Sequence, residues 1–489
     1  MLENQHSEIF TIGVGGAAGD GVKKAGIKIA DFLRGRGYEV YVSFDYPSLI
    51  RGGHNFTRLS FSKNRIWCDH SKLDILIALN EESVELHRGE LKEGAKIITD
   101  IPLLKISENP EIVLEEDVSK MPFDTKTELI DGNTAFAKGL QAAGLDFYLA
   151  YPMTPATSIL HYLASQSHSA KATRDKQTKE GLKVIQPENE ISVINMALGM
   201  AYAGKRAAVG TATGGFALMQ EAFSFAGMAE LPLVVAVSQR QAPATGVPTH
   251  SSQSDLRFVV HAGHGEFPRI VLAPGDPEES FRAGADALNL TWKFKVPVIV
   301  LLDKILSEHM MTSSIDSNLI SVERNKDMVF PGAPDAVVKV TSYEHDENGI
   351  TIDKAEDVKK AIEKRFEKEK NIEEEMQNIE TVKIYGDIDN KNVIVFFGST
   401  KGSVLEASKY FNKPAKLMQI VWLEPFDTEK VKRELEGRKI ICIEGNHNGQ
   451  LASLIREKTG IEIKNKILKY DSMPFDPIEL AEEINKIWN

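Results

Sequence analysis

Apolar residues cover most of the circumference of a helix that the sequence predicts after Glu190. They recur at helical spacing and include Ile191, Ile194, Met196, Ala197, Leu198, Met200 and Ala201. A helix that is apolar nearly all round is expected to be buried. Glu190 stands at its first turn, where a carboxylate ordinarily offsets the exposed amides of a helix start. Pressed against such a surface, the same carboxyl group would be desolvated and partly protonated near neutral pH, as acid–base chemistry requires.

Short strands and helices alternate through the first 112 residues. Strands are predicted at 9–14, 56–62, 74–79 and 96–99, and a helix from Val22 to Arg36. Five glycines suit a tight turn between the first strand and this helix: Gly13, Gly15, Gly16, Gly19 and Gly21. Their spacing is not that of a strict dinucleotide-binding loop, and no acidic residue closes the next strand in a ribose-binding position. We therefore expect a small α/β unit whose glycines serve close packing, followed by a polar tether around 115–126.

The middle of the chain predicts a parallel sheet covered by helices on both faces. Strands at 146–150, 232–238, 270–273 and 297–302 alternate with helices at 133–144, from about Pro155, and at 277–292. Ligand sites in such sheets lie at the carboxyl ends of the strands. Thr154 and Arg240 each follow a strand directly, so both are expected where a ligand binds.

The sequence changes character between about 321 and 386. The segment EDVKKAIEKRFEKEKNIEEEMQNI is rich in charge, with Val358, Ile362, Phe366, Ile372, Met376 and Ile379 at helical spacing. This pattern predicts a solvated helix or helix pair packed along one stripe. The last hundred residues return to strands and helices, with a closing helix from about Pro477. There the turn Gly398–Thr400 could bind phosphate at a helix start, or simply close a parallel domain.

Composition excludes several classes of protein. The chain has 489 residues, 42% apolar and 26% charged, with a formal net charge of -12, which argues against nucleic acid as a partner. No apolar run approaches the roughly 18 residues of a membrane helix, and MLENQHSEIF lacks a signal-peptide pattern, so we expect a cytoplasmic protein without a membrane partner.

The metal-binding residue types are sparse and scattered. Cys68 and Cys442 are the only two cysteines, whereas an iron–sulfur cluster takes about four thiolates. We expect two buried, reduced thiols, and any cluster on another chain. His250, His261 and His264 have no acidic or cysteine companion at useful spacing, so no metal site is expected here.

Motifs along nearly the whole chain resemble one enzyme family. The stretch around Glu190 contains Gly199, Ala203 and Gly204, and TATGG, ELP and Arg240 with PATGVPT follow it. YPMTP, PVIVLLDKILSE, EHDENG and EGNHNGQL occur elsewhere in the same order as in the family, and the first 120 or so residues include IRGG. The chain resembles the α subunit of 2-oxoacid:ferredoxin oxidoreductases with the γ domain fused in front.

The resemblance implies a three-domain α/β fold. Residues 1–118 correspond to the γ-type domain, 127–320 to a parallel-sheet domain that binds the pyrimidine of thiamine diphosphate, and 387–489 to a transketolase C-terminal-like domain. A charged helical connector at 321–386 joins the last two. A β subunit is implied as partner, holding the diphosphate with its magnesium and the iron–sulfur cluster, and ferredoxin binds through that partner.

The resemblance also assigns residues to roles. Glu190 matches the family's activating glutamate, and Tyr151, Pro152 and Thr213 join it as cofactor-binding positions. Thr154, Arg240 and Thr245 match substrate positions, although Arg240 could serve in a surface ion pair and Thr154 as a helix N-cap. Where the family commonly reads GPSTG and SGPG, this chain has APATG and TATGG, so the loop differs from the family at positions that bear on substrate or coenzyme A contacts and not on the thiamine step.

Three functions are compatible with these residues. The first is oxidative decarboxylation of a 2-oxo acid with coenzyme A to acyl-CoA, carbon dioxide and reduced ferredoxin. The second is a non-redox thiamine enzyme of the transketolase or decarboxylase type, and the third a catalytically decayed accessory subunit. Retention of Glu190, Thr154 and Arg240 argues against decay. The loops do not distinguish 2-oxoglutarate, pyruvate and branched-chain 2-oxo acids as substrates.

Overall fold

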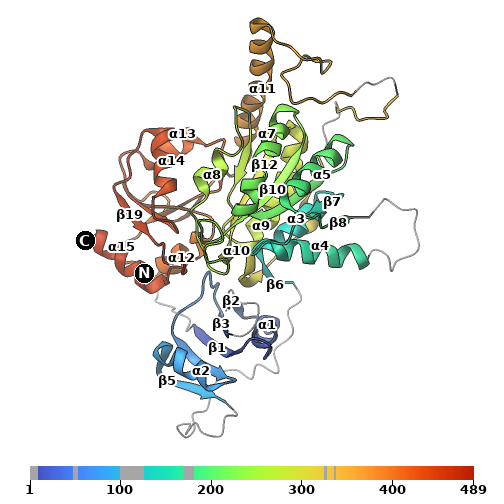
Figure 1. Cartoon of the computed structure of the whole chain (residues 1–489). Coiled ribbons are helices and arrows are strands. Elements are labelled where there is room, and N and C mark those ends of the chain that lie inside the picture. Colours follow the sequence, from blue (N-terminus) through green and yellow to red (C-terminus); the bar gives the residue numbers. More distant parts are fainter. Residues whose placement is uncertain are drawn as a thin grey trace.

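The computed structural model describes residues 9–47, 53–99, 126–169, 181–323, 328–334 and 338–488, which form three sheets with their covering helices (Figure 1). Residues 50–52 of the IRGG motif, and the predicted tether up to residue 125, lie outside the described residues. The predicted α/β fold class is confirmed, since each sheet contains parallel pairs and helices follow the strands. No helix among the described residues is both long and apolar enough to span a lipid bilayer.

The first sheet has the order β5-β4-β1-β3-β2-β13-β6. The N-terminal segment contributes β1 (Phe10–Ala17), α1 (Val22–Gly35), β2 (Glu39–Asp45), β3 (His54–Ser62), β4 (Leu73–Ala78), α2 (Glu81–His87) and β5 (Leu91–Ile98). Its last two strands, β6 (Glu128–Asp131) and β13 (Met310–Ser313), come from beyond the predicted limit at residue 118. Both strands thus lie within the predicted central domain but pair in the first sheet, because a strand's pattern shows which face is buried but not which sheet it joins.

Three of the five glycines predicted for the first turn lie in the preceding strand. Gly13, Gly15 and Gly16 lie within β1 and not in a turn, which corrects the prediction that the strand ends at Val14. A Cβ atom on Gly13 would stand 2.5 Å from the Phe56 ring, and one on Gly15 2.7 Å from Ser83 Oγ. These glycines thus allow neighbouring elements to pack against the strand backbone.

The central sheet has the order β17-β11-β12-β10-β9-β7-β8 and is parallel except for the pairing of β17 with β11. Its strands are β7 (Phe147–Leu149), β8 (Lys183–Ile185), β9 (Ala207–Ala212), β10 (Leu233–Gln239), β11 (Ile270–Leu272), β12 (Pro297–Asp303) and β17 (Trp422–Glu424). The helices are α3 (Gly132–Ala142), α4 (Thr157–Ser169), α5 (Glu190–Tyr202), α6 (Thr213–Leu218), α7 (Gln220–Met228), α8 (Leu256–Val260), α9 (Pro277–Phe294) and α10 (Lys304–Glu308). One buried cluster lies beneath α5 to α8 and another beneath α3, α4 and α9, as predicted for a sheet covered on both faces.

The third sheet has the order β14-β16-β15-β18-β19. It consists of β14 (Val382–Gly386), β15 (Asn392–Phe397), β16 (Lys416–Ile420), β18 (Lys439–Glu444) and β19 (Asn465–Leu468), with α12 (Thr400–Ala407), α13 (Thr428–Leu435), α14 (Gln450–Thr459) and α15 (Pro477–Trp488). β14 lies within the predicted connector, which ends at residue 386, but pairs antiparallel with β16 of the third sheet. The likeness of this domain to transketolase stays a prediction.

The charged segment forms one helix, α11 (Ala355–Met376), which projects from the body of the molecule (Figure 1). Ile372 and Met376 are buried, whereas Ile362 is exposed. The C-terminal half of the predicted apolar stripe is therefore buried, while Val358 and Phe366 in its first half are half-buried.

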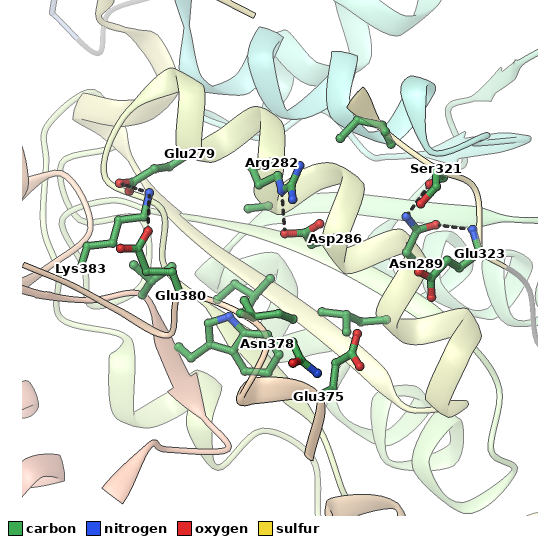
Figure 2. A pocket seen from close by; sticks show the side chains of 17 residues that line it. Glu279, Arg282, Asp286, Asn289, Ser321, Glu323, Glu375, Asn378, Glu380 and Lys383 are labelled. Atoms are coloured by element: carbon green, nitrogen blue, oxygen red, sulfur yellow. Dashed lines mark hydrogen bonds and ion pairs between the residues drawn. The ribbon is translucent and has the colours of Figure 1, made fainter. Parts of the chain in front are cut away.

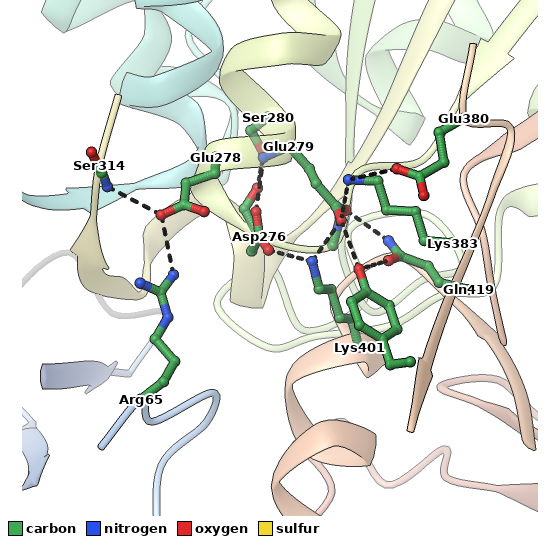
Figure 3. A network of polar contacts seen from close by, with 12 residues as sticks. Arg65, Asp276, Glu278, Glu279, Ser280, Ser314, Glu380, Lys383, Lys401 and Gln419 are labelled. Carbon is green, nitrogen blue, oxygen red and sulfur yellow. Dashed lines mark hydrogen bonds and ion pairs between the residues drawn. The ribbon is translucent and has the colours of Figure 1, made fainter. Parts of the chain in front are cut away.

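A buried ionic cluster joins the C-terminal domain to α9 (Figure 3). Lys401 on α12 contacts Asp276 and lies 2.5 Å from Glu279 Oε1, and Lys383 lies 3.1 Å from the same carboxylate. Burial alone would raise the pKa of Glu279, but Lys401 and Lys383 outweigh it and lower the pKa to about 2. The cluster is almost fully shielded from water, so loss of its cation would leave buried charge uncompensated.

The Gly398–Thr400 turn is filled by the protein's own side chains. The backbone N–H of Ser399 donates to Asp303 Oδ2 at 3.3 Å, and Thr400 Oγ1 donates to Gln253 Oε1 at 2.8 Å. Asp303 is buried at the end of β12. The turn therefore docks the C-terminal domain onto the central sheet, which corrects the suggestion of a phosphate site.

Candidate active site

The first turn of α5 presents Glu190 on the buried side of the helix. Asn189 caps the helix, its Oδ1 accepting from the Ser192 backbone N–H at 2.9 Å. Glu190 is 4% exposed, whereas Ile191 is 52% exposed and Met196 also faces outward. The expectation of burial nearly all round is therefore wrong for one face of α5, because apolar composition cannot distinguish a core face from a surface left for another contact.

One oxygen of the Glu190 carboxyl group has no hydrogen-bond partner among the residues that the structure describes. This atom, Oε1, is buried. It lies against Gly215 of α6, where an added Cβ atom would stand 2.8 Å from Oε1 and 2.1 Å from Thr211 Oγ1. A buried oxygen without a donor is unfavourable by about 1–3 kcal/mol. A buried oxygen without a donor, packed against a glycine backbone, indicates a ligand-binding position.

Arg240 and Thr154 meet at the carboxyl ends of two strands. Arg240 follows β10, Thr154 lies in the loop after β7, and Arg240 Nη1 donates to the Thr154 carbonyl oxygen at 2.8 Å. None of the ion pairs among the described residues includes Arg240, and α4 begins only at Thr157, so Thr154 does not stand at the N-cap of that helix. Desolvation lowers the pKa of the Arg240 guanidinium.

The loop after Arg240 holds the third predicted substrate residue. Val247 N–H donates to the Gln241 carbonyl oxygen at 3.0 Å and closes the loop at its base. Thr245 lies at the exposed tip between Ala244 and Gly246, whose φ angles are 53° and 51°. A positive φ is unusual for alanine, so the tip has a defined shape rather than that of an ordinary extended segment.

The sheet order gathers the predicted residues along one edge. β8, β7, β9 and β10 are neighbours, and they lead respectively to Glu190, to Tyr151 and Pro152, to Thr213, and to Arg240. Tyr151 is exposed and Pro152 and Thr213 are half-buried. Arg240 thus follows a strand of a parallel sheet, as expected, and the loops and helices that carry the other residues leave the same carboxyl edge.

Two residues near this edge, Asp255 and Gln239, were not predicted from the sequence. Thr213 Oγ1 donates to Asp255 Oδ2 at 2.7 Å, and the Asp255 N–H donates to Gln239 Oε1 at 3.0 Å. Asp255 stands before a short helix and has the sequence signature of an N-cap, although its side chain makes no capping bond. Only the folded chain reveals its partner, which lies 42 residues earlier.

The structure also contains a pocket of about 420 Å³ between α9, the end of α11 and β17 (Figure 2). None of the predicted site residues lines it. Its carboxylates face cations: Asp286 lies 3.4 Å from Arg282 Nε, and Glu279 lies 3.1 Å from Lys383 Nζ. The candidate active site is therefore the carboxyl edge of the central sheet and not this pocket.

Comparison with known proteins decides the family. Residues 138–381 match the family model described as pyruvate flavodoxin/ferredoxin oxidoreductase, thiamine diphosphate-binding, and residues 11–204 match the model for pyruvate ferredoxin/flavodoxin oxidoreductase. The 2-oxoglutarate synthase subunit KorA of Methanocaldococcus jannaschii is 30% identical over 341 residues, 66% of this chain and 89% of that subunit. This chain belongs to the 2-oxoacid:ferredoxin oxidoreductase family.

Two further relatives extend the match. The 2-oxoacid:ferredoxin oxidoreductase subunit alpha of Saccharolobus solfataricus is 37% identical over 402 residues, 76% of this chain and 63% of that subunit. The structure of 2-oxoglutarate:ferredoxin oxidoreductase from Magnetococcus marinus, solved with 2-oxoglutarate, coenzyme A and succinyl-CoA bound, superposes with a TM-score of 0.86 at 26% identity. It covers 98% of this chain and 99% of that chain. The oxidoreductase prediction is confirmed over the non-redox thiamine alternative.

The residues present fit thiamine diphosphate, the cofactor of this family's matching domain. The unpartnered Oε1 of Glu190 offers a hydrogen-bonding atom, and Gly215 leaves room beside it. Gly214 has open space above it, so a ligand can approach the backbone of α6 closely. The observation that supports the fit is the buried carboxyl oxygen, to which none of the described residues donates a hydrogen bond.

Both cysteines are free and buried, in different domains, as predicted. Burial raises the pKa of both thiols well above the ordinary value. Cys442 Sγ donates to Glu444 Oε1 at 3.3 Å. Within the described ranges, no group of three or more His, Cys, Asp or Glu side chains is arranged to hold a metal ion.

Proposed function

We propose that this chain supplies one half of a thiamine diphosphate site that oxidatively decarboxylates a 2-oxo acid together with a β subunit. The substrate loses carbon dioxide and a pair of electrons, its acyl group passes to the thiol of coenzyme A, and ferredoxin takes the electrons through the partner. The observation that carries the proposal is the buried, unpartnered Oε1 of Glu190 at the carboxyl edge of the central sheet.

Glu190 acts as the acid–base residue. When bound, thiamine diphosphate supplies the carbon nucleophile that attacks the keto group. Glu190 exchanges a proton at Oε1 with the pyrimidine end of that cofactor, and the apolar surroundings of α5 keep water from competing for the carboxyl group. Tyr151, Pro152 and Thr213 border the same edge and contact the cofactor.

Arg240 and Thr154 bind the substrate. The planar guanidinium of Arg240 uses one N–H on the Thr154 carbonyl, and its remaining N–H groups pair with the carboxylate of the 2-oxo acid. The hydroxyl groups of Thr154 and Thr245 donate to the substrate from the two loops. The bond between Arg240 and Thr154 supports this role, because it orients the cation before the substrate arrives.

The partner covers the outer face of α5 and the end of α6. Exposed apolar side chains lie on the elements around Glu190: Tyr151, Ile191, Met196, Leu218 and Val247. A Cβ atom on Gly199 would meet nothing within 4 Å, so the packing of this chain alone does not require glycine there. An apolar surface of this kind beside a half-buried site supports docking of a second subunit.

The partner is also needed for the rest of the chemistry. Two distant cysteines cannot supply the roughly four thiolates of an iron–sulfur cluster, so the cluster belongs to the β subunit. The same subunit binds the diphosphate and its magnesium. The named α-subunit relatives support a multi-subunit enzyme.

The decisive experiment purifies the tagged chain with its partner from its own cells and assays a panel of 2-oxo acids with coenzyme A and a viologen dye. Dye reduction that requires both a 2-oxo acid and coenzyme A is expected. The isolated chain should show no such activity and should bind thiamine diphosphate with magnesium weakly or not at all in calorimetric titration. Tight one-to-one binding, or an inactive complex, would overturn the half-site proposal.

A further inference from the structure

A hydrogen bond between Thr213 and Asp255, the Thr213–Asp255 tether, holds the start of α6, the helix that lies against the proposed catalytic residue Glu190. Thr213 is the first residue of α6. Ala212, at the N-cap position before it, has no polar side-chain atom that could accept a capping hydrogen bond. The Thr213 hydroxyl donates to Asp255 Oδ2 at 2.7 Å. Asp255 is 9% exposed, so this bond is largely shielded from water. A short, uncapped helix is thus fixed at its start by a tertiary bond.

The position of this helix start matters for Glu190. Gly215 stands two residues after Thr213, and its backbone forms the wall against which the Glu190 carboxyl group lies. An added Cβ atom there would reach 2.8 Å from both Cγ and Oε1 of Glu190. Movement of the first turn of α6 by even part of an ångström would therefore displace the carboxyl group or open the wall to water.

Asp255 is itself clamped by two domains. Its N–H donates to Oε1 of Gln239, the last residue of β10. On the C-terminal side, the N–H of Gln253 donates to the Gly445 carbonyl oxygen at 2.7 Å, and the Arg257 N–H donates to Gln450 Oε1 at 2.9 Å. The segment that holds Thr213 is therefore positioned by both the central sheet and the C-terminal domain.

The polarity of the pair follows from its chemistry. An ionised carboxylate only accepts hydrogen bonds, so the Thr213 hydroxyl proton is committed to Asp255. On its half-exposed side, the Thr213 hydroxyl oxygen therefore has only lone pairs to offer and can act only as a hydrogen-bond acceptor. Burial raises the pKa of Asp255, and the hydroxyl group of Thr213 opposes this rise.

From this arrangement we infer that Asp255 is a positioning residue for the 2-oxo acid reaction: it fixes the first turn of α6 behind Glu190 and makes the Thr213 oxygen an acceptor toward the cofactor. The role rests on the proposed function of the site around Glu190. It also gives the C-terminal domain a part in catalysis, since that domain holds the segment from Gln253 to Arg257 in place.

The tether is tested first in the full-length chain alone, without cofactor or partner. Hydrogen exchange is measured on peptides covering residues 213–219 in Asp255→Asn and Thr213→Val. Exchange about 10-fold faster or more than in the parent is expected, with Thr213→Ser close to the parent. The matched control is Thr381→Val, which removes an equivalent bond to Asp427 in the C-terminal domain and should leave these peptides unchanged. Unchanged exchange in both site variants refutes the tether.

The catalytic part is tested in the complex purified with its partner. Asp255→Asn and Thr213→Val should lower kcat by about 10- to 100-fold and weaken thiamine diphosphate binding. KM for the 2-oxo acid should stay within about two-fold, because Arg240 and Thr154 are untouched. The double variant should be no worse than either single variant, and Thr213→Ser should restore activity.

Three results would overturn the catalytic role of Asp255. They are additive losses of kcat in the double variant, a rise in KM as large as the fall in kcat, or a kcat that is unaltered in both single variants. A parent complex that is inactive toward every 2-oxo acid refutes the proposed function and with it the catalytic role of Asp255. The exchange measurement on the isolated chain decides the tether separately.

Discussion

Arg240 and Thr154, which are 86 residues apart, are joined by a hydrogen bond of 2.8 Å from the guanidinium Nη1 to the backbone carbonyl oxygen. The bond links the loop after β10 to the loop after β7. The bond uses one of the five N–H donors of Arg240 and fixes the orientation of the guanidinium group that carries the other four. The two loops proposed to bind substrate are thus coupled before any substrate arrives.

Glu190→Gln should retain the fold and slow turnover of the assembled enzyme by about 100- to 10,000-fold, the usual contribution of a positioned acid–base group. Steady-state assays with saturating 2-oxo acid measure the loss. Glu188→Gln is the matched control, because Glu188 is exposed on the same loop and accepts a hydrogen bond from the Ser192 hydroxyl group. Near-normal turnover in Glu190→Gln would remove this residue from the mechanism.

Arg240→Ala should raise KM for the 2-oxo acid far more than it changes kcat. Loss of the cation leaves the substrate carboxylate without its partner, an effect of roughly 2–5 kcal/mol. Initial rates over a wide range of substrate concentration separate the two constants. Arg282→Ala, an exposed arginine on α9, should behave as the parent. A fall in kcat with KM unchanged contradicts the substrate role.

Lys401→Met should destabilise the chain by about 3–5 kcal/mol, because it leaves Asp276 and Glu279 buried together without their shared cation. The pKa of Glu279 lies near 2 in the folded chain, below its ordinary value of 4.5. Its contribution to stability is therefore present above pH 4.5 and lost as pH falls toward 2. Urea unfolding of the parent between pH 7 and pH 3 should show this loss, and Lys401→Met should flatten it. A variant as stable as the parent at pH 7 contradicts the prediction.

Asp286→Asn should stabilise the chain at alkaline pH. Burial raises the pKa of Asp286 to about 6, Arg282 opposes the rise, and Glu323 and Glu375 add to it. The stability contributed by this group is therefore full below its ordinary pKa of 3.8 and is lost as pH rises through 6. Because the Asp286 side chain is partly exposed, the expected increase in the free energy of unfolding of Asp286→Asn over the parent is about 1 kcal/mol at pH 8.

Thermal unfolding of Asp286→Asn at pH 5 and pH 8 measures that difference. Glu363→Gln on the exposed face of α11 serves as the control carboxamide. An Asn variant that is equally destabilised at both pH values would show that the ion pair with Arg282 dominates.

Sequence patterns placed Thr154 and Arg240 at one sheet edge, because each directly follows a predicted strand of a parallel sheet whose strand ends converge. Glu190 received its role from the family resemblance, and that role stays a prediction. Asp255 could not be found in this way, since its signature is that of an ordinary helix cap and its partner lies on another helix. The exposed face of α5 was also missed, because an apolar residue in a core and one awaiting a partner look alike in a single chain.

The pairing of β13 with β2 has a consequence for how this chain can be divided. A polypeptide ending at residue 118 would carry β2 as an open edge, with its backbone donors and acceptors unused. The remainder of the chain would carry β13 and β6 as a ready-made ribbon. Two separately synthesised pieces could therefore recombine by strand addition, and the same hydrogen bonds that now close one sheet would then become the joint between two gene products.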